Sequence, residues 1–279
     1  MKKELIVQRS PKSPIAEVFR TLRTNIQFMN SKKTLKTLLF TSTMPGEGKS
    51  WISSNLAITF AQAGKKVILI DADMRKGRLH NMFQTDKVPG LSNYLSGIDS
   101  LGNTHNDIIK YVRETEIDNL FLIPAGNIPP NPSELLASEL TVEMLERLKD
   151  VFDIVILDGT PSLLVTDAII LSRLVDTTII VTSHKFTKKD NLQKVKKAIE
   201  NVGGNIAGVV INKIPVNVSK YESTYYYSST PYRAKPEKIV EKPVKPREIY
   251  KFENDGNLSN EKTKEIMSEL DDFLRKQNS

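Results

Sequence analysis

The stretch FTSTMPGEGKSWISSNLA, residues 40–57, carries a glycine-rich turn between a strand-like and a helical pattern. Its glycines would let backbone N–H groups face an anion, to which a helix N-terminus adds its partial positive charge. Lys49 would reach the β and γ phosphates of a nucleotide, and the Ser50 hydroxyl would bind Mg²⁺. The turn predicts a nucleoside triphosphate site, although Thr43 stands where the strict motif has glycine. The expected nucleotide contacts are Pro45, Gly46, Glu47, Gly48, Lys49, Ser50 and Trp51.

Three carboxylates follow strand-like stretches. Asp71 and Asp73 follow the apolar letters VILI, and Asp158 follows DIVIL. Because ligands of open α/β sheets bind at the carboxyl ends of the strands, all three should lie beside the glycine-rich turn. We expect Ser50, Asp71 and Asp158 to hold Mg²⁺, directly or through water, and Asp71 or Asp73 to orient or deprotonate an attacking hydroxyl. A single aspartate at a strand end more commonly caps a turn, but three beside such a loop favour chemistry.

An alternation of strand-like and helical stretches would position these residues. The expected strands are 37–42, 66–71, 120–125, 153–158, 177–183 and 205–212. The expected helices are 15–29, 49–64, 141–150, 166–174 and 188–201, the first with an apolar stripe of Ile15, Val18, Phe19, Leu22 and Ile26. The alternation predicts an α/β fold with a doubly wound, mostly parallel sheet flanked by helices.

The pattern stops near residue 215, which predicts a domain of residues 1–215 and a flexible C-terminal tail of residues 216–279. The tail begins with a cluster that holds five of the eight tyrosines of the chain: Tyr221, Tyr225, Tyr226, Tyr227 and Tyr232. A linker rich in Lys, Pro and Glu follows, and residues 259–276 have the spacing of a short amphipathic helix. Tyrosines among Ser, Thr, Lys and Pro have little to bury them and should be exposed, or alternatively they pack on the domain or extend a sheet edge.

Composition limits the class of protein. The chain has no cysteine, which excludes disulfides and thiol chemistry and fits a reducing compartment. Its three histidines are far apart, so we expect no zinc site. No apolar run reaches the roughly 18 residues of a membrane span, and the start lacks the apolar region of a signal peptide. The net charge of +7 is not concentrated in a basic run, so we expect no nucleic-acid partner.

Three stretches, TSTMPGEGKS, VILIDADMRKGRLH and VILDGTPS, resemble the bacterial tyrosine kinases that regulate capsule and exopolysaccharide synthesis. The resemblance covers residues 10–230, and its most specific part is a second Walker-type motif, DxDxR, at Asp71, Asp73 and Arg75. It implies a protein-tyrosine kinase that uses ATP and Mg²⁺, with catalytic residues Lys49, Asp71, Asp73 and Asp158. It also implies autophosphorylation of the tail tyrosines, mainly in trans, as the regulatory event. Asn212 stands where related ATPases contact adenine.

The resemblance also implies partners. The stretch EVFRTLR fits the ExxRxxR motif of the family at Glu17, Arg20 and Arg23, which there seals a ring-shaped homo-oligomer. On a helical wheel these three residues lie opposite the apolar stripe, so we expect them to face outward. A cytoplasmic location is implied, with recruitment to the inner face of the cell membrane by a membrane-bound activator whose cytoplasmic tail completes the ATP site. A protein-tyrosine phosphatase would reverse the modification.

Two alternatives and three departures accompany this interpretation. A partitioning or division-site ATPase switch would carry a lysine early in the loop, where this chain has Met44, and a nucleotide-binding scaffold without kinase activity would keep the same motifs. The departures are Gly77 in place of the proline common in the family, Gly159 after Asp158, and residues 233–279 beyond the tyrosine cluster. They bear on tail geometry and fine positioning more than on nucleotide binding.

Overall fold

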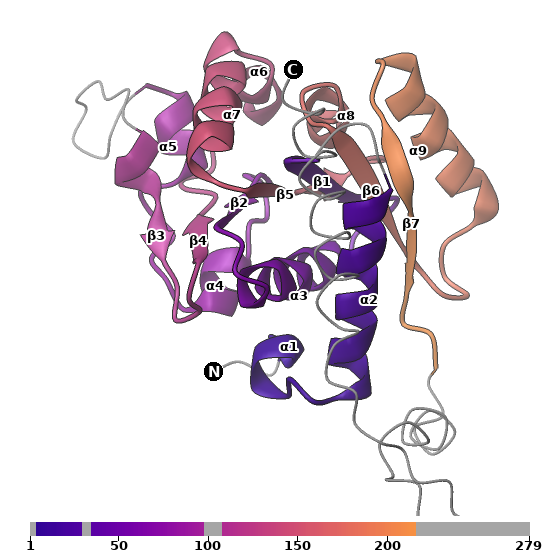
Figure 1. Ribbon diagram of the computed structural model, residues 1–279. Coiled ribbons are helices and arrows are strands. Elements are labelled where there is room, and N and C mark those ends of the chain that lie inside the picture. The colour runs from indigo at the N-terminus through magenta and orange to yellow at the C-terminus, as the bar shows by residue number, and fades with distance from the viewer. Residues whose placement is uncertain (1–3, 30–34, 98–107, 216–279) are drawn as a thin grey trace, which may run out of the picture. The chain divides into compact units, whose positions relative to one another are not determined.

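The structure, a computed structural model, describes residues 4–29, 35–97 and 108–215 of the chain (Figure 1). All of these residues belong to one structural unit. The expected tyrosine cluster, linker and C-terminal helix lie outside the described residues. Among those described, no helix combines the length and the apolar character needed to cross a membrane.

A seven-stranded sheet forms the centre, in the order β3-β4-β2-β5-β1-β6-β7 (Figure 1). Its strands are β1 (Thr37–Ser42), β2 (Val67–Asp71), β3 (Arg113–Glu114), β4 (Leu120–Ile123), β5 (Ile154–Pro161), β6 (Thr177–Ser183) and β7 (Ile206–Asn212). Every neighbouring pair is parallel except β3 and β4. From β1 the chain winds toward β2 on one side and later toward β6 and β7 on the other. The predicted doubly wound, mostly parallel sheet is therefore confirmed, and β1 lies where the winding direction changes.

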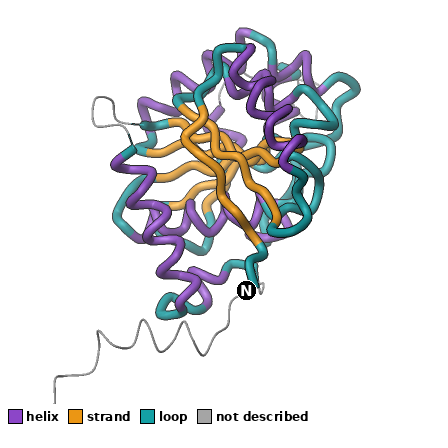
Figure 2. Tube along the Cα trace, turned by 90° about the vertical axis from the view of Figure 1, so that its right-hand side faces the viewer, coloured by secondary structure: helices purple, strands orange, loops and turns teal. Residues whose placement is uncertain are grey.

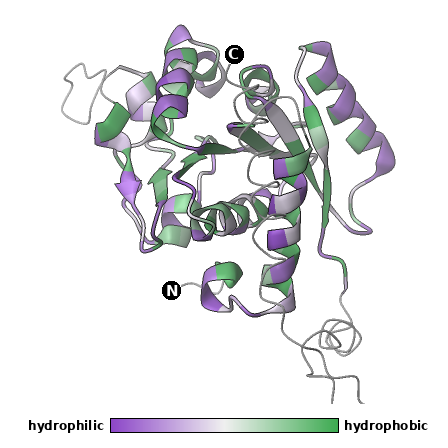
Figure 3. Cartoon of the chain, in the orientation of Figure 1, coloured by the Kyte–Doolittle hydropathy of each residue, from purple (hydrophilic) through white to green (hydrophobic). Residues whose placement is uncertain are grey.

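Helices cover both faces of the sheet (Figure 2). One face carries α1 (Ile6–Arg9), α2 (Pro14–Phe28), α3 (Lys49–Gln62) and α4 (Leu79–Phe83). The other carries α5 (Leu91–Leu95), the 3-10 helix η1 (Ile108–Tyr111), α6 (Pro132–Leu136), α7 (Glu139–Val151), α8 (Asp167–Ser172) and α9 (Lys189–Asn201). Successive β1 residues point to opposite faces, so Phe40 joins the first core and Leu39 the second. Figure 3 shows mainly apolar residues in the central strands, as burial on both faces requires.

The long elements lie where the sequence pattern predicts them, with ends that shift by a few residues. The pattern missed β3, which has two residues, and five helices of four or five residues each: α1, α4, α5, η1 and α6. Elements this short contain too few residues to show a period. The largest shift at a strand end is in β5, which continues beyond Asp158 to Pro161.

The buried face of α2 differs from the predicted stripe. Phe19 and Ile26 are buried as expected, but Ile15 and Val18 are 43% and 46% exposed. Phe19 packs edge-on against the Trp51 ring of α3, with the ring centroids 5.1 Å apart. This contact turns the helix so that the side of Ala16 and Phe19 faces α3. The prediction of a five-residue buried stripe is therefore wrong at its first two members.

The same rotation changes the placement of the ExxRxxR residues. Arg23 donates a hydrogen bond to the Thr59 carbonyl of α3 at 2.8 Å, so the expectation that it faces away from the domain is wrong. Arg20 and Glu17 form an ion pair at 2.7 Å and remain partly exposed, at 34% and 44% of their side-chain area. All three members of the motif are partly exposed, and Arg23 is the one whose guanidinium is engaged with α3.

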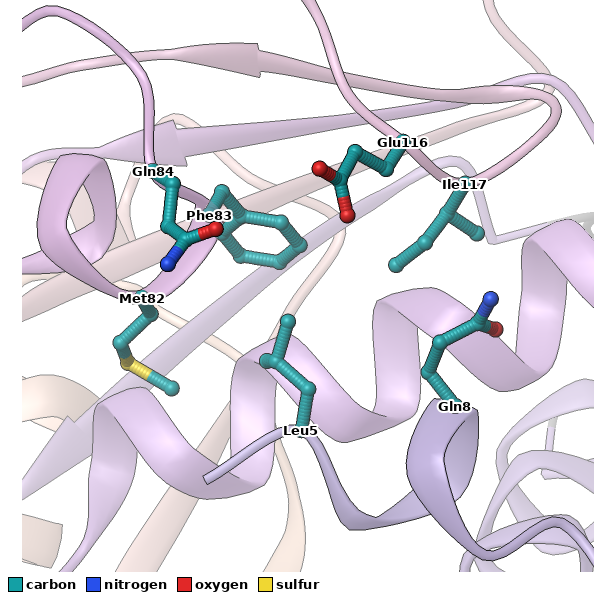
Figure 4. A pocket seen from close by; sticks show the side chains of 7 residues that line it. All are labelled: Leu5, Gln8, Met82, Phe83, Gln84, Glu116 and Ile117. Carbon is teal, nitrogen blue, oxygen red and sulfur yellow. The ribbon is translucent and has the colours of Figure 1, made fainter. Parts of the chain in front are cut away.

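The N-terminal segment is fastened to α3 by one buried side chain. The Asn55 carboxamide accepts a hydrogen bond from the Val7 N–H and donates one to the Glu4 carbonyl, each at 3.0 Å. Figure 4 shows the crevice between this segment and α4, which is lined by Leu5, Gln8, Met82, Phe83, Gln84, Glu116 and Ile117. Its volume is about 10 Å³, space for about one water molecule. The crevice is a small packing gap beside the fastened segment.

Candidate active site

The glycine-rich turn joins β1 to α3 and depends on its glycines. Gly46 and Gly48 have φ angles of +80° and +98°, the left-handed region that residues with a Cβ rarely adopt. A Cβ added to Gly48 would also lie 2.1 Å from the Asn212 Nδ2 atom. That Asn212 amide donates to the Glu47 carbonyl at 2.9 Å, and Lys213 Nζ donates to the Gly46 carbonyl at 2.7 Å. The end of β7 therefore braces the turn, a placement of Asn212 that the sequence did not indicate.

Glu47 holds the turn together from inside the protein. Its buried carboxylate accepts hydrogen bonds from the Thr43 N–H at 2.7 Å, the Thr43 hydroxyl at 2.9 Å and the Met44 N–H at 2.9 Å. It also accepts one from the Thr187 hydroxyl, in the loop between β6 and α9. Thr43 thus contributes a hydroxyl to this network at the position where the strict motif has glycine. Because the Glu47 carboxylate is engaged here, only its backbone is available to a nucleotide.

The structure brings the predicted cation and carboxylates together. Asp71 and Asp158 are register partners on the adjacent strands β2 and β5. The Lys49 Nζ atom lies 3.4 Å from Asp73 Oδ2, 3.6 Å from Asp158 Oδ1 and 3.4 Å from Ser50 Oγ. The first helical turn of α3 and the carboxyl ends of two central strands therefore meet at one point.

Burial and mutual proximity set the ionisation of this cluster. Burial alone would lower the pKa of Lys49, but the charges of Asp158, Asp73 and Asp71 outweigh it, so the pKa is raised and Lys49 stays protonated. Burial, together with the charge of Asp158, raises the pKa of Asp71 to about 7. Burial also raises the pKa of Asp158, against the opposing effect of Lys49. The site thus combines a stable cation with two buried carboxyl groups whose pKa values are raised, that of Asp71 to about 7.

The oxygen atoms of the cluster fit a magnesium ion. The Oδ1 atom of Asp71 is buried and has no hydrogen-bond partner, and the buried Asp158 carboxylate faces the Ser50 hydroxyl and Lys49. Among the described residues, no group of three or more His, Cys, Asp or Glu side chains is arranged to hold a metal ion. A hydroxyl and one or two carboxylates suit Mg²⁺, which keeps several waters and shares phosphate oxygens with its substrate.

A cavity of about 420 Å³ opens beside the cluster. Three segments line most of it: the turn with the start of α3, the loop after β2, and the segment from Thr160 to Val165. The loop after β2 contributes Asp73, Arg75, Lys76 and Arg78. Arg78 pairs with Glu4 of the N-terminal segment at 2.7 Å. Trp51 lines the cavity as well, so of the residues predicted to contact nucleotide only Glu47 and Asn212 do not border it.

Arg75, which lines the cavity, connects the loop after β2 to α8. Its Nε and Nη2 atoms donate to Asp167, the first residue of α8, at 2.8 and 3.1 Å. Ser133 of α6 donates its hydroxyl to the same carboxylate at 2.5 Å. The sequence analysis named Arg75 as part of a motif without a role and did not name Asp167. An acidic residue at the start of a helix is commonly explained by its favourable interaction with the helix dipole, so Asp167 gave no further signal.

Comparison with known proteins agrees with this arrangement. Residues 35–209 match the AAA domain family. The chain is 41% identical over 206 residues to the tyrosine-protein kinase CpsD of Streptococcus agalactiae, covering 74% of this chain and 85% of that protein. It is 36% identical over 229 residues to the tyrosine-protein kinase YwqD of Bacillus subtilis, covering 82% and 93%.

A solved structure gives the same assignment. The kinase domain of the Escherichia coli tyrosine kinase ETK superimposes with a TM-score of 0.69 at 32% identity, over 76% of this chain and 82% of that chain. The glycine-rich turn, the buried lysine and the strand-end carboxylates all lie within residues 35–209, which match the AAA domain family. The chain belongs to the family of bacterial tyrosine-protein kinases built on an AAA-type phosphate-binding domain.

Proposed function

We propose that this chain transfers the γ-phosphoryl group of ATP to tyrosines, chiefly those of its own C-terminal cluster and mainly in trans. Through this modification it would regulate the synthesis and export of a capsule or exopolysaccharide. The observation that carries the proposal is the buried cluster of Lys49, Asp73 and Asp158 at the glycine-rich turn, beside a cavity of about 420 Å³. The same chain supplies a candidate acceptor, because five of its eight tyrosines lie in residues 221–232.

ATP binding would use the backbone of the turn and one buried cation. Backbone N–H groups at a helix N-terminus bind phosphate oxygens, and Lys49 adds a full charge where negative charge spreads over the transferred group. Ser50 and Asp158 would hold Mg²⁺ directly and Asp71 through water, which leaves the Asp71 carboxylate able to accept a proton. When bound, the ion neutralises charge on the β and γ phosphates. Asn212 braces the turn in the structure, and a contact of this residue with adenine remains part of the proposal.

The transfer step needs an acceptor for the phenolic proton. The tyrosine oxygen forms a bond to the γ-phosphorus, the bond from that phosphorus to the bridging oxygen breaks, and ADP leaves. We assign the released proton to Asp71, whose Oδ1 atom has no partner and whose pKa is raised to about 7. Asp73 accepts from the Lys76 N–H at 2.9 Å and lies 3.4 Å from Lys49, so its role is to orient the lysine.

These two assignments predict different pH profiles. Activity of the unsubstituted chain should rise as the pH increases through about 7, because only ionised Asp71 accepts a proton. Asp73→Asn should lower the rate and keep this rise, whereas Asp71→Asn should remove it. If Asp71→Asn keeps the rise and Asp73→Asn removes it, Asp73 is the base.

Oligomerisation and recruitment complete the proposal. Glu17 and Arg20 are exposed enough to contact a second copy in a ring, while Arg23 is engaged with α3. A membrane-bound activator would bring the protein to the inner face of the membrane and complete the ATP site with its cytoplasmic tail. A protein-tyrosine phosphatase would reset the cluster. Each phosphate would add about 1.5 to 2 negative charges per tyrosine, which should loosen the ring.

A mixing experiment tests kinase activity and its direction together. The full-length chain is incubated with Mg²⁺ and ATP, with and without a candidate activator tail, and phosphotyrosine is mapped by mass spectrometry. Two variants are compared: Lys49→Met, and a chain with all five cluster tyrosines changed to Phe. Each alone should show no phosphotyrosine in residues 221–232. Mixed, they should label the Lys49→Met tail, because the five-Phe chain keeps the active site.

The outcomes separate the candidate functions. Labelling in the mixture establishes transfer in trans, and labelling of wild type without labelling in the mixture would establish transfer in cis. ATP hydrolysis without any phosphotyrosine, even with the activator tail, would instead indicate a nucleotide-driven switch ATPase. The five-Phe chain is the matched control for folding, since its substitutions lie outside residues 1–215.

A further inference from the structure

Leu164 is an exposed apolar side chain on a wall of the active-site cavity. It follows the end of β5 and is 57% exposed, although it borders the cavity that contains Lys49 and Asp73. The preceding residue, Leu163, points the other way and packs against the core beneath α9. A single exposed leucine is common on protein surfaces, but one that borders a concave site beside a charged cluster offers an apolar contact to a bound ligand.

The backbone around Leu164 holds it in this position. The Ser162 N–H donates to the Ser42 carbonyl at 2.8 Å, and the Leu164 N–H donates to the Pro161 carbonyl at 3.3 Å. The Thr41 and Ser162 hydroxyls lie 2.6 Å apart, which ties the segment to β1 a second time. Three residues later Asp167 is fixed by the ion pair with Arg75. The wall is therefore formed before any ligand arrives.

The lining of the cavity is polar in one part and apolar in another. Polar groups of Lys49, Ser50 and Asp73 gather where the turn meets α3. The apolar residues Pro161, Leu164 and Val165 line the cavity at and beyond the last residue of β5. A phenol matches this order, since its hydroxyl is at the tip and the rest of the ring is apolar. Serine and threonine carry the hydroxyl next to the backbone, so they could bring it to the phosphate only by moving polar backbone past the apolar wall.

We infer that Leu164, supported by Pro161 and Val165, forms the subsite that packs against the acceptor ring and makes the site select tyrosine over serine and threonine. The inference rests on the proposed kinase function and adds the residue that sets its acceptor specificity. The occupant is a tyrosine of residues 221–232 from a second copy, the segment in which the acceptors are concentrated.

The test uses the five-Phe chain as enzyme, so that an added peptide is the acceptor. A synthetic peptide of residues 219–234 with Tyr226 as its single tyrosine is compared with the same peptide carrying serine there. Leu164→Ala should raise KM for the tyrosine peptide about tenfold, the loss expected for shortening an apolar contact by a few carbons. KM for ATP and the rate of ATP hydrolysis should stay unchanged, and the preference for tyrosine over serine should fall.

Two further variants exclude general effects. Val151→Ala is the matched control, because Val151 is an apolar side chain, 44% exposed, that precedes β5 at the opposite end of the sheet. It should leave both KM values unchanged. Leu164→Met, which keeps the apolar contact, should restore most of the affinity for the tyrosine peptide.

The results distinguish this inference from the function on which it rests. If the five-Phe chain phosphorylates the peptide and Leu164→Ala leaves its KM unchanged, the subsite is wrong and the kinase stands. A rise in KM for ATP in place of the peptide would assign Leu164 to the nucleotide and also overturn the inference. If the five-Phe chain with Leu164 intact does not phosphorylate the tyrosine peptide, both the proposed kinase function and the Leu164 subsite are overturned.

Discussion

Removing Arg75 should destabilise the fold more than removing its partner Asp167, although both substitutions break the same ion pair. Asp167 is almost fully buried, with 1% of its side chain exposed, whereas 38% of the Arg75 side chain is exposed. The Arg75 Nε and Nη2 atoms donate to the two carboxylate oxygens of Asp167 at 2.8 and 3.1 Å, so the ion pair is bidentate. The asymmetry in burial is the origin of the prediction.

The magnitudes follow from what each substitution leaves behind. Arg75→Met leaves a buried carboxylate with only the Ser133 hydroxyl as donor, and breaking a buried pair in this way costs about 3 to 5 kcal/mol. Asp167→Asn leaves a guanidinium that can turn toward water, so the loss is that of charged hydrogen bonds, about 1.5 to 3 kcal/mol. The double variant contains no unpaired buried charge and should lose less than the sum of the two.

Urea unfolding provides the assay. Trp51 is the only tryptophan of the chain and packs on Phe19, so its fluorescence reports loss of the packing between α2 and α3. Free energies from the four chains of the cycle give the coupling energy directly. Equal losses for the two single variants, or strict additivity in the double variant, would refute the argument that burial of Asp167 dominates.

Other perturbations address the site and its supports. The pKa of Asp71 is raised from 3.8 to about 7 in the folded state. Between these pH values the folded state binds a proton that the unfolded state has lost, so the stability of the protein falls as the pH rises. Asp71→Asn should therefore stabilise the protein more at pH 8 than at pH 5, by on the order of 3 kcal/mol in urea titrations. A stabilisation by Asp71→Asn that is the same at both pH values would contradict this prediction. Gly77→Ala should cost about 1 to 3 kcal/mol, because its Cβ would lie 2.4 Å from that of Ala125 and 2.9 Å from Asp71 Oδ2; an unchanged melting temperature would count against the packing argument. Glu47→Ala should weaken ATP binding by about tenfold or more in calorimetry, since two N–H groups of the turn lose their acceptor. Thr187→Val removes one of the four hydrogen bonds to that carboxylate and should have a smaller effect, so equal losses would be inconsistent with the network.

The sequence by itself determined the type of fold and the chemistry of the site. The glycine-rich turn, Lys49 and Ser50 are neighbours along the chain, so their joint role can be read without knowing any distant contact. Asp71 and Asp158 are far apart in sequence, but each ends a strand-like stretch of a parallel sheet. Because the carboxyl ends of such strands meet at one edge, their approach to the turn followed from the alternation of strands and helices.

The orientation of helices was decided by tertiary packing. The apolar residues of α2 fit more than one rotation, and the contact of Phe19 with Trp51 selected the one that exposes Ile15 and Val18. That rotation also turned Arg23 toward the Thr59 carbonyl. Periodicity measures how wide an apolar stripe is, but which part of the stripe is buried depends on the shape of the partner.

The supports of the site were likewise visible only in three dimensions. Arg75 and Asp167 are 92 residues apart, and Glu47 and Thr187 are 140 apart. Asp167 and Thr187 belong to no local sequence motif. An acidic residue at the start of a helix and a threonine in a loop each have a common local explanation. Local patterns specify which groups can react, whereas the groups that hold them in place come from segments that meet only when the sheet has formed.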